Sequence, residues 1–135
     1  MSGTDQPFFV DRGLGRHQVP NALRAVGETV VCHDDLYAQH TPDTEWLQAE
    51  AAKGSLILTK DPSIGHNPLE KAMVKRTGAM VFALTSANMK GADNAEAVVK
   101  ARHRMKQFAR KHKGPFIAKV DRNGQVRVWK MEGDL

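Results

Sequence analysis

The chain has 135 residues, of which 41% are hydrophobic and 26% are charged, values typical of one globular domain and not of extended disorder. The single cysteine, Cys32, excludes an internal disulfide framework and a multi-cysteine zinc site, which favours a cytoplasmic protein. The sequence lacks a secretory signal pattern and any stretch near the roughly 18 apolar residues of a membrane span, so we expect no membrane partner.

The net charge of +5 is distributed unevenly along the chain. Residues 1–65 contain 5 Lys and Arg against 9 Asp and Glu, whereas residues 66–135 contain 15 against 6. An acidic half suits a cation site, and a basic half suits a polyanion such as nucleic acid.

Short runs of strand-forming residues alternate with segments of helical period. In chain order, we expect strands in residues 7–11, 28–35, 54–63 and 79–87 and a hairpin in residues 116–130, with helices in residues 19–27, 41–54, 67–78 and 93–113. The hairpin prediction depends on Asn123-Gly124, which favours positive backbone angles.

Helix boundaries are predicted from capping residues. Asn67 is the expected N-cap of the third helix, with Glu70 at its capping-box position and Gly78 as its stop. Thr41 is the expected N-cap of the second helix. Asp93 has capping-box spacing with Glu96 and marks the expected start of the long helix.

This alternation predicts an α/β fold with a mostly parallel central sheet flanked by helices and a C-terminal β-hairpin, because parallel neighbours need crossover connections. We expect one domain over residues 7–130. Residues 1–6 and 131–135 are expected to be loose ends.

Acids follow three of the predicted strands. Asp11 ends the first, Asp34 and Asp35 the second, and Asp61 the third. The carboxyl ends of parallel strands share one edge, where ligands of open α/β folds bind, so we expect Asp61 to lie near Asp11. Carboxylates that share a small volume must be separated, protonated or neutralised, and Mg²⁺ or Mn²⁺ is the simplest counterion.

Asp43 and Glu45 begin the helix expected in residues 41–54. They could supply a further acid to the same edge of the sheet. They could equally serve only to complement the helix dipole, and the spacing leaves both readings open.

Five segments in this order resemble the PIN-like domain family, in particular the compact branch that includes VapC-type toxins: FFVDRGLG, HDD, TPDTEWL, LILTKD and PFIAKV. The resemblance covers residues 7–130. It implies a PIN-like fold and a Mg²⁺- or Mn²⁺-dependent ribonuclease in which Asp11, Asp43 and Asp61 are catalytic metal ligands, with Glu45 as the substitute for Asp43. It also implies an RNA substrate, a toxin role, a cognate antitoxin that blocks the crevice, and homodimers.

Two positions depart from the family pattern, because Arg12 and Ser63 stand where related sequences often carry acids. Arg12 and Lys60 lie beside proposed ligands, so they contact the scissile phosphate or only offset negative charge. Asp34, or Asp35 in its place, joins the metal site or caps a loop.

Several other residues have two possible uses. The basic residues of the helix at 93–113 could contact an RNA backbone or only solvate that helix. Trp46 and Trp129 are expected to pack in the core or at its rim rather than stack on bases. The histidines lack zinc-site spacing and are expected in loops or at the surface: His33, His40 and His66.

Two other functions fit parts of the same pattern. A receiver-type phosphoacceptor switch would use Asp11, Asp61 and either Thr85 or Ser86, but Arg12 and the basic half of the chain fit it poorly. The other alternative is a PIN-like module that binds nucleic acid or a protein partner without catalysis.

Overall fold

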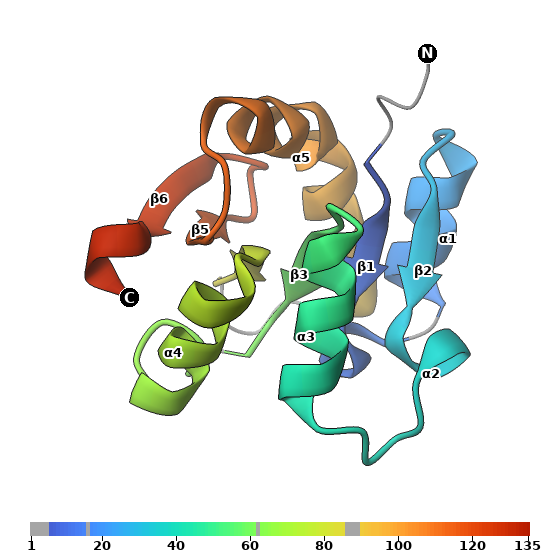
Figure 1. Cartoon of the computed structure of the whole chain (residues 1–135). Coiled ribbons are helices and arrows are strands. Elements are labelled where there is room, and N and C mark those ends of the chain that lie inside the picture. Colours follow the sequence, from blue (N-terminus) through green and yellow to red (C-terminus); the bar gives the residue numbers. More distant parts are fainter. Residues whose placement is uncertain (1–5, 16, 62, 86–89) are drawn as a thin grey trace.

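The computed structural model describes residues 6–15, 17–61, 63–85 and 90–135. Its centre is one six-stranded sheet in the order β2-β1-β3-β4-β5-β6 (Figure 1). The strands are β1 (Phe8–Val10), β2 (Val30–Cys32), β3 (Leu56–Thr59), β4 (Met80–Leu84), β5 (Phe116–Val120) and β6 (Val126–Lys130). All neighbours from β2 to β5 pair in parallel, and β6 pairs antiparallel with β5. The predicted α/β sheet with a C-terminal hairpin is confirmed.

Helices cover both faces of this sheet. They are α1 (Gln18–Ala25), α2 (His33–Leu36), α3 (Asp43–Ala52), α4 (Pro68–Thr77) and α5 (Gly91–Lys111), with short 3₁₀ turns η1 (Arg12–Leu14) and η2 (Glu132–Asp134). The apolar sides of α1 and α5 pack on one face, and those of α3 and α4 pack on the other. Within the described ranges, no helix is both long and apolar enough to cross a membrane.

The strands alternate their side chains between these two layers. Phe8 and Val10 point into the core beneath α1 and α5, whereas Phe9 points toward α3 and α4. All three residues are fully buried. Continuous apolar runs such as FFV and LIL are therefore strands covered on both faces, as parallel strands in α/β folds are.

The start of α4 confirms one predicted cap and corrects another. Asn67 Oδ1 accepts hydrogen bonds from the backbone N–H groups of Leu69 and Glu70 at 2.9 and 3.3 Å, and Gly78 ends the helix with a φ of 75°. The capping-box role expected for Glu70 is wrong. Its carboxylate contacts Ser63 instead, which places it in the pocket described below.

One helix lies where a strand was predicted, and another begins later than predicted. The second strand ends at Cys32, and the following His-Asp-Asp-Leu segment is the one-turn helix α2, where acids in the first turn complement the helix dipole. Helix α3 begins at Asp43, with Pro42 rather than Thr41 at the cap, because the Pro42 backbone is still extended.

The ends of the C-terminal half also differ from expectation. Helix α5 begins at Gly91, and Asp93 is its third residue, whose Oδ2 accepts the backbone N–H of Lys90 at 3.2 Å. Residues 131–135, expected as a loose end, contain η2, and Leu135 packs against the core beneath α4. Of the other expected loose end, residues 1–5 lie outside the described residues.

Candidate active site at the carboxyl edge of the sheet

The strand order creates a crevice at the end of β1. Strand β2 lies on one side of β1 and β3 on the other, so the winding of the chain reverses between β1 and β3. In open α/β sheets, ligands bind outside the carboxyl ends of the strands at such a point. A pocket of about 120 Å³ opens there, well above the roughly 10–15 Å³ that one water needs.

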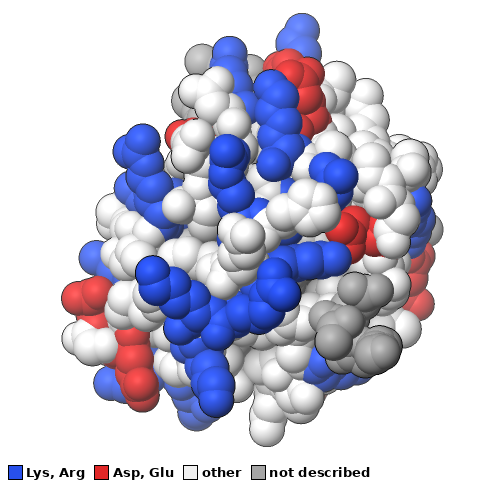
Figure 2. Space-filling view, turned by 90° about the horizontal axis from the view of Figure 1, so that it is seen from above, with Lys and Arg blue, Asp and Glu red and all other residues white. Residues whose placement is uncertain are grey.

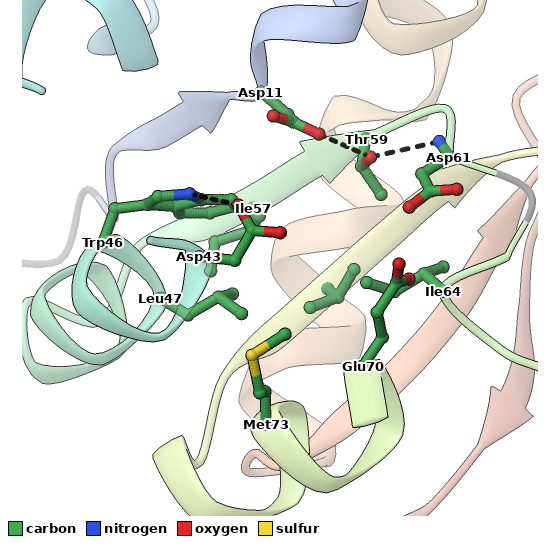
Figure 3. A pocket seen from close by; sticks show the side chains of 11 residues that line it. Asp11, Asp43, Trp46, Leu47, Ile57, Thr59, Asp61, Ile64, Glu70 and Met73 are labelled. Atoms are coloured by element: carbon green, nitrogen blue, oxygen red, sulfur yellow. Dashed lines mark hydrogen bonds between the residues drawn. The ribbon is translucent and has the colours of Figure 1, made fainter. Parts of the chain in front are cut away.

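Acids from four separate parts of the chain line this pocket (Figure 3). Asp11 follows β1, Asp43 begins α3, Asp61 follows β3, and Glu70 lies in the first turn of α4. The other lining residues are Trp46, Leu47, Ile57, Thr59, Ile64, Met73 and Val81. The structure therefore brings the three predicted catalytic acids to one cavity, and their role as ligands stays a prediction.

Asp11 is held by hydrogen bonds on both carboxylate oxygens. The backbone N–H of Arg12 donates to Oδ1 at 2.7 Å, and the Thr59 hydroxyl donates to Oδ2 at 2.9 Å. Burial nevertheless raises the pKa of Asp11 above its ordinary value, although these two hydrogen bonds act in the opposite direction. The folded chain thus keeps a carboxylate where its negative charge is unfavourable.

A serine links the next two acids. The backbone N–H and hydroxyl of Ser63 contact Asp61 Oδ1 at 2.9 and 2.8 Å, and the same hydroxyl lies 3.1 Å from Glu70 Oε1. Because a serine hydroxyl carries one proton, it donates to only one of these carboxylates at a time. Burial raises the pKa of Glu70, and the negative charge of Asp61 raises it further.

Asp43 is oriented from within its own helix. The indole Nε1 of Trp46 donates to Asp43 Oδ1 at 2.9 Å, and the Trp46 ring stacks on Phe9 with 5.2 Å between ring centroids. The exposed side chain of Glu45 does not line the pocket. The geometry therefore favours Asp43 over Glu45 as the acid from this helix.

The remaining predicted site residues lie outside the pocket lining. Arg12 Nε forms an ion pair with Asp34 Oδ1 at 3.2 Å, so these two residues contact each other. The exposed residues Asp35 and Lys60 are likewise absent from the lining. Because Arg12 and Asp34 have opposite charges and pair with each other, they add little net charge beside the pocket.

The expectation that His33 lies in a loop or at the surface is wrong. Its side chain is only 2% exposed, and its ring packs against the rings of Phe9, Tyr37 and Trp46. His33 Nδ1 also contacts Asp34 Oδ1 at 3.0 Å. His33 is therefore a core residue that helps to place Asp34.

The donor set of the pocket fits a hard divalent cation. All four acids offer carboxylate oxygens, the ligands that Mg²⁺ and Mn²⁺ prefer. A cation would offset the cost of burying the Asp11 charge. Among the residues that the structure describes, however, no three acids, histidines or cysteines stand close enough together to hold a metal as they are. The side chains must turn inward to share one ion.

Sequence reasoning missed Glu70 as a pocket residue, although a signal was present. A helix that connects parallel strands runs antiparallel to them, so the first turn of α4 must lie at the carboxyl edge of the sheet. Glu70 lies in that turn. The same rule brings Asp43, the first residue of α3, to this edge.

The sequence is similar to known proteins over most of its length. A family model described as a PIN like domain matches residues 7–86. A protein of Mycobacterium tuberculosis named "Putative ribonuclease VapC45" is 33% identical over 125 residues, which cover 90% of each chain. No solved structure matches this chain significantly. With the fold and the acidic pocket described above, these similarities show that the chain belongs to the PIN-like domain family.

Proposed function

We propose that this protein is a metal-dependent endoribonuclease and the toxin of a toxin-antitoxin pair. One observation carries the proposal. Asp11, Asp43, Asp61 and Glu70 follow or begin four different elements of the fold and line one pocket at the switch point of the sheet. A second support is the similarity to a protein whose name describes a ribonuclease.

The residues that would hold Mg²⁺ or Mn²⁺ are Asp11, Asp43 and Asp61, with Glu70 as a fourth carboxylate. When bound, such a cation stabilises negative charge on a phosphodiester and makes water a better nucleophile. Thr59 keeps Asp11 turned toward the pocket, and Ser63 keeps Asp61 beside Glu70. Hydrolysis would break one phosphorus–oxygen bond of the RNA and form another to the oxygen of the attacking water.

Lys60 and Arg12 are the proposed phosphate contacts beside this pocket. The side chain of Lys60 is exposed, and no hydrogen bond or ion pair joins it to another described residue. It can therefore meet a phosphate without breaking an existing contact. Arg12 would first have to leave Asp34.

The toxin role implies a protein partner. We propose a cognate antitoxin that covers the carboxyl edge of the sheet and thereby blocks the pocket from RNA. The site of action would be the cytoplasm, where both RNA and a newly made antitoxin are available, and a homodimer is compatible with this role.

A receiver-type switch fits the structure less well. Asp61 would be its phosphoacceptor, but the backbone and side chain of Ser63 already contact this carboxylate. Thr85 does not line the pocket, and Ser86 lies outside the described residues. Membership of the PIN-like family also favours the nuclease.

The proposal is tested by expressing the wild-type protein and Asp11→Asn in a bacterial host and mapping new RNA 5′ ends. Asp11→Asn removes one charge and keeps the shape of the side chain. We expect growth arrest and new ends only with the wild type. Equal toxicity of both proteins would remove the catalytic assignment. RNA binding without cleavage in added Mn²⁺ would instead indicate a non-catalytic module.

A further inference from the structure

The second half of α5 presents an exposed basic stripe, defined here as Lys100, His103, Arg104, Gln107, Arg110 and Lys111. These residues recur every three or four positions, so they lie on one side of the helix. The opposite side, with Ala101, Met105 and Ala109, is buried against the sheet. From Lys100 to Lys111, every exposed residue of the helix is basic or an amide.

Little within the protein offsets the charge of this stripe. Lys100 pairs with Glu96 at 2.8 Å, and Arg104 donates a hydrogen bond to the Gly124 carbonyl at 3.0 Å. Across the part of the chain that the structure describes, the side chains of Arg110 and Lys111 form no hydrogen bond or ion pair. Cations in the last turn do favour the helix dipole, but this effect does not extend to residues two turns earlier.

The β5–β6 turn extends the same surface. Gly124 lies against the helix so closely that a side chain there would come within 2.7 Å of Lys100 Cβ. The turn therefore packs beside the stripe and adds the exposed residue Arg122 to it. Figure 2, which looks onto this end of the molecule, shows Lys and Arg spread across the face with few acids between them.

The stripe ends at the edge of the sheet opposite to the acidic pocket. Helix α5 is followed by the start of β5 after four residues, so its C-terminal end lies where the parallel strands begin. The pocket lies where these strands end. At about 3.3 Å per residue, the five residues of β4 alone separate the two edges by roughly 16 Å.

We propose that the basic stripe is a second RNA-binding surface, which holds the backbone of an RNA away from the pocket that cleaves it. Charge complementarity carries the proposal. From Lys100 to Lys111, α5 presents cations along about 17 Å at 1.5 Å per residue. The polyanion that a ribonuclease meets is RNA. The choice of RNA rests on the proposed function.

The test compares Arg110→Gln/Lys111→Gln with Lys75→Gln/Arg76→Gln, each combined with Asp11→Asn so that RNA is not cut. The control pair removes the same charge from exposed positions of α4, on the other face of the sheet. Binding of labelled polyuridylate is measured by fluorescence anisotropy at several salt concentrations. Thermal unfolding verifies that each variant folds.

Each lost phosphate contact should lower the slope of log affinity against log salt by about 0.7. We therefore expect the stripe variant to lose about 1.4 from the slope, and the control pair to change it little. Equal losses from both pairs, or no loss from the stripe pair, would overturn the proposal. Equally tight binding of polyglutamate, a polyanion without phosphates, would also overturn it, because the stripe would then attract any polyanion and not RNA in particular.

This design separates the stripe from the cleavage pocket. If the stripe pair weakens binding but the wild type never cleaves RNA, the proposed function fails and the binding surface stands. If the wild type cleaves RNA and the stripe pair binds it normally, the binding surface fails alone.

Discussion

Thr59 donates a hydrogen bond from its hydroxyl to Oδ2 of Asp11 over 2.9 Å and thereby joins the carboxyl ends of β3 and β1. The same hydroxyl oxygen accepts the backbone N–H of Asp61 at 3.1 Å. Thr59 is itself buried. One side chain thus orients the two acids nearest to the switch point, and both contacts depend on its oxygen.

Replacing Thr59 by Val should separate these two acids while keeping the shape of the side chain. The backbone N–H of Asp61 and one oxygen of Asp11 would lose their partner, so we expect a loss of about 1–3 kcal/mol in the free energy of unfolding. Urea denaturation measures it. Thr59→Ser keeps the hydroxyl and should lose less, and an equal loss from both variants would show that the hydroxyl contributes no more than the methyl group.

Replacing Glu70 by Gln should have opposite effects on stability and on metal binding. Without metal, the change removes a half-buried charge that Asp61 repels, so the unfolding temperature in EDTA should rise. Affinity for Mn²⁺, measured by calorimetric titration, should fall about tenfold or more. Glu45→Gln is the matched control, because Glu45 does not line the pocket. Unchanged Mn²⁺ affinity in Glu70→Gln would exclude Glu70 from the metal site.

The raised pKa of Asp11 predicts how stability without metal depends on pH. Between the ordinary value of 3.8 and the higher folded value, the unfolded chain has released the Asp11 proton and the folded chain has kept it. Rising pH through this window therefore favours unfolding. In EDTA, the free energy of unfolding of Asp11→Asn minus that of the wild type should increase as the pH rises through this window. At higher pH the difference should stay constant.

Urea denaturation of both proteins from about pH 3 to about pH 8 measures this difference. The Asn variant lacks the titrating group, so the other acids largely cancel in the comparison. A relative stability that falls as the pH rises would mean that the hydrogen bonds of Asp11 outweigh its burial.

Gly65 and Trp129 hold the loop that follows Asp61. A side chain at Gly65 would lie 2.5 Å from atoms of the Trp129 ring, which is also fixed by Lys119 Nζ at 4.5 Å from its ring centre. Gly65→Ala should therefore destabilise the protein by about 1–3 kcal/mol.

Trp129→Leu should relieve part of that collision. In a double-mutant cycle based on urea denaturation, the loss in the double variant should be smaller than the sum of the single losses by about 0.5 kcal/mol or more. Additive losses would show that the loop can move away from the ring, and that β6 does not fix its position.

Local sequence features were sufficient to predict the sheet. Leu56, Ile57 and Leu58 lie between Gly54 and Pro62, and a short apolar run between such residues forms a strand when helices cover both faces. The shared edge of parallel strands then brings Asp11 close to Asp61 without knowledge of any side-chain conformation.

The placements that failed depend on side-chain packing. Glu70 satisfies the spacing of a capping box and also reaches Ser63, and only the path of the loop between β3 and α4 decides between the two contacts. His33 is buried because Phe9, Tyr37 and Trp46 surround its ring, and two of these, Phe9 and Trp46, lie more than ten residues away in the sequence. Sequence spacing contains neither kind of information.

The most direct test is the anomalous scattering of manganese in crystals soaked with Mn²⁺. We expect a peak in the pocket lined by Asp11, Asp43, Asp61 and Glu70, and no peak there in crystals of Asp11→Asn. A wild-type pocket without manganese, or manganese bound only at Asp34 outside it, would contradict a metal-dependent active site at the β1/β3 switch point.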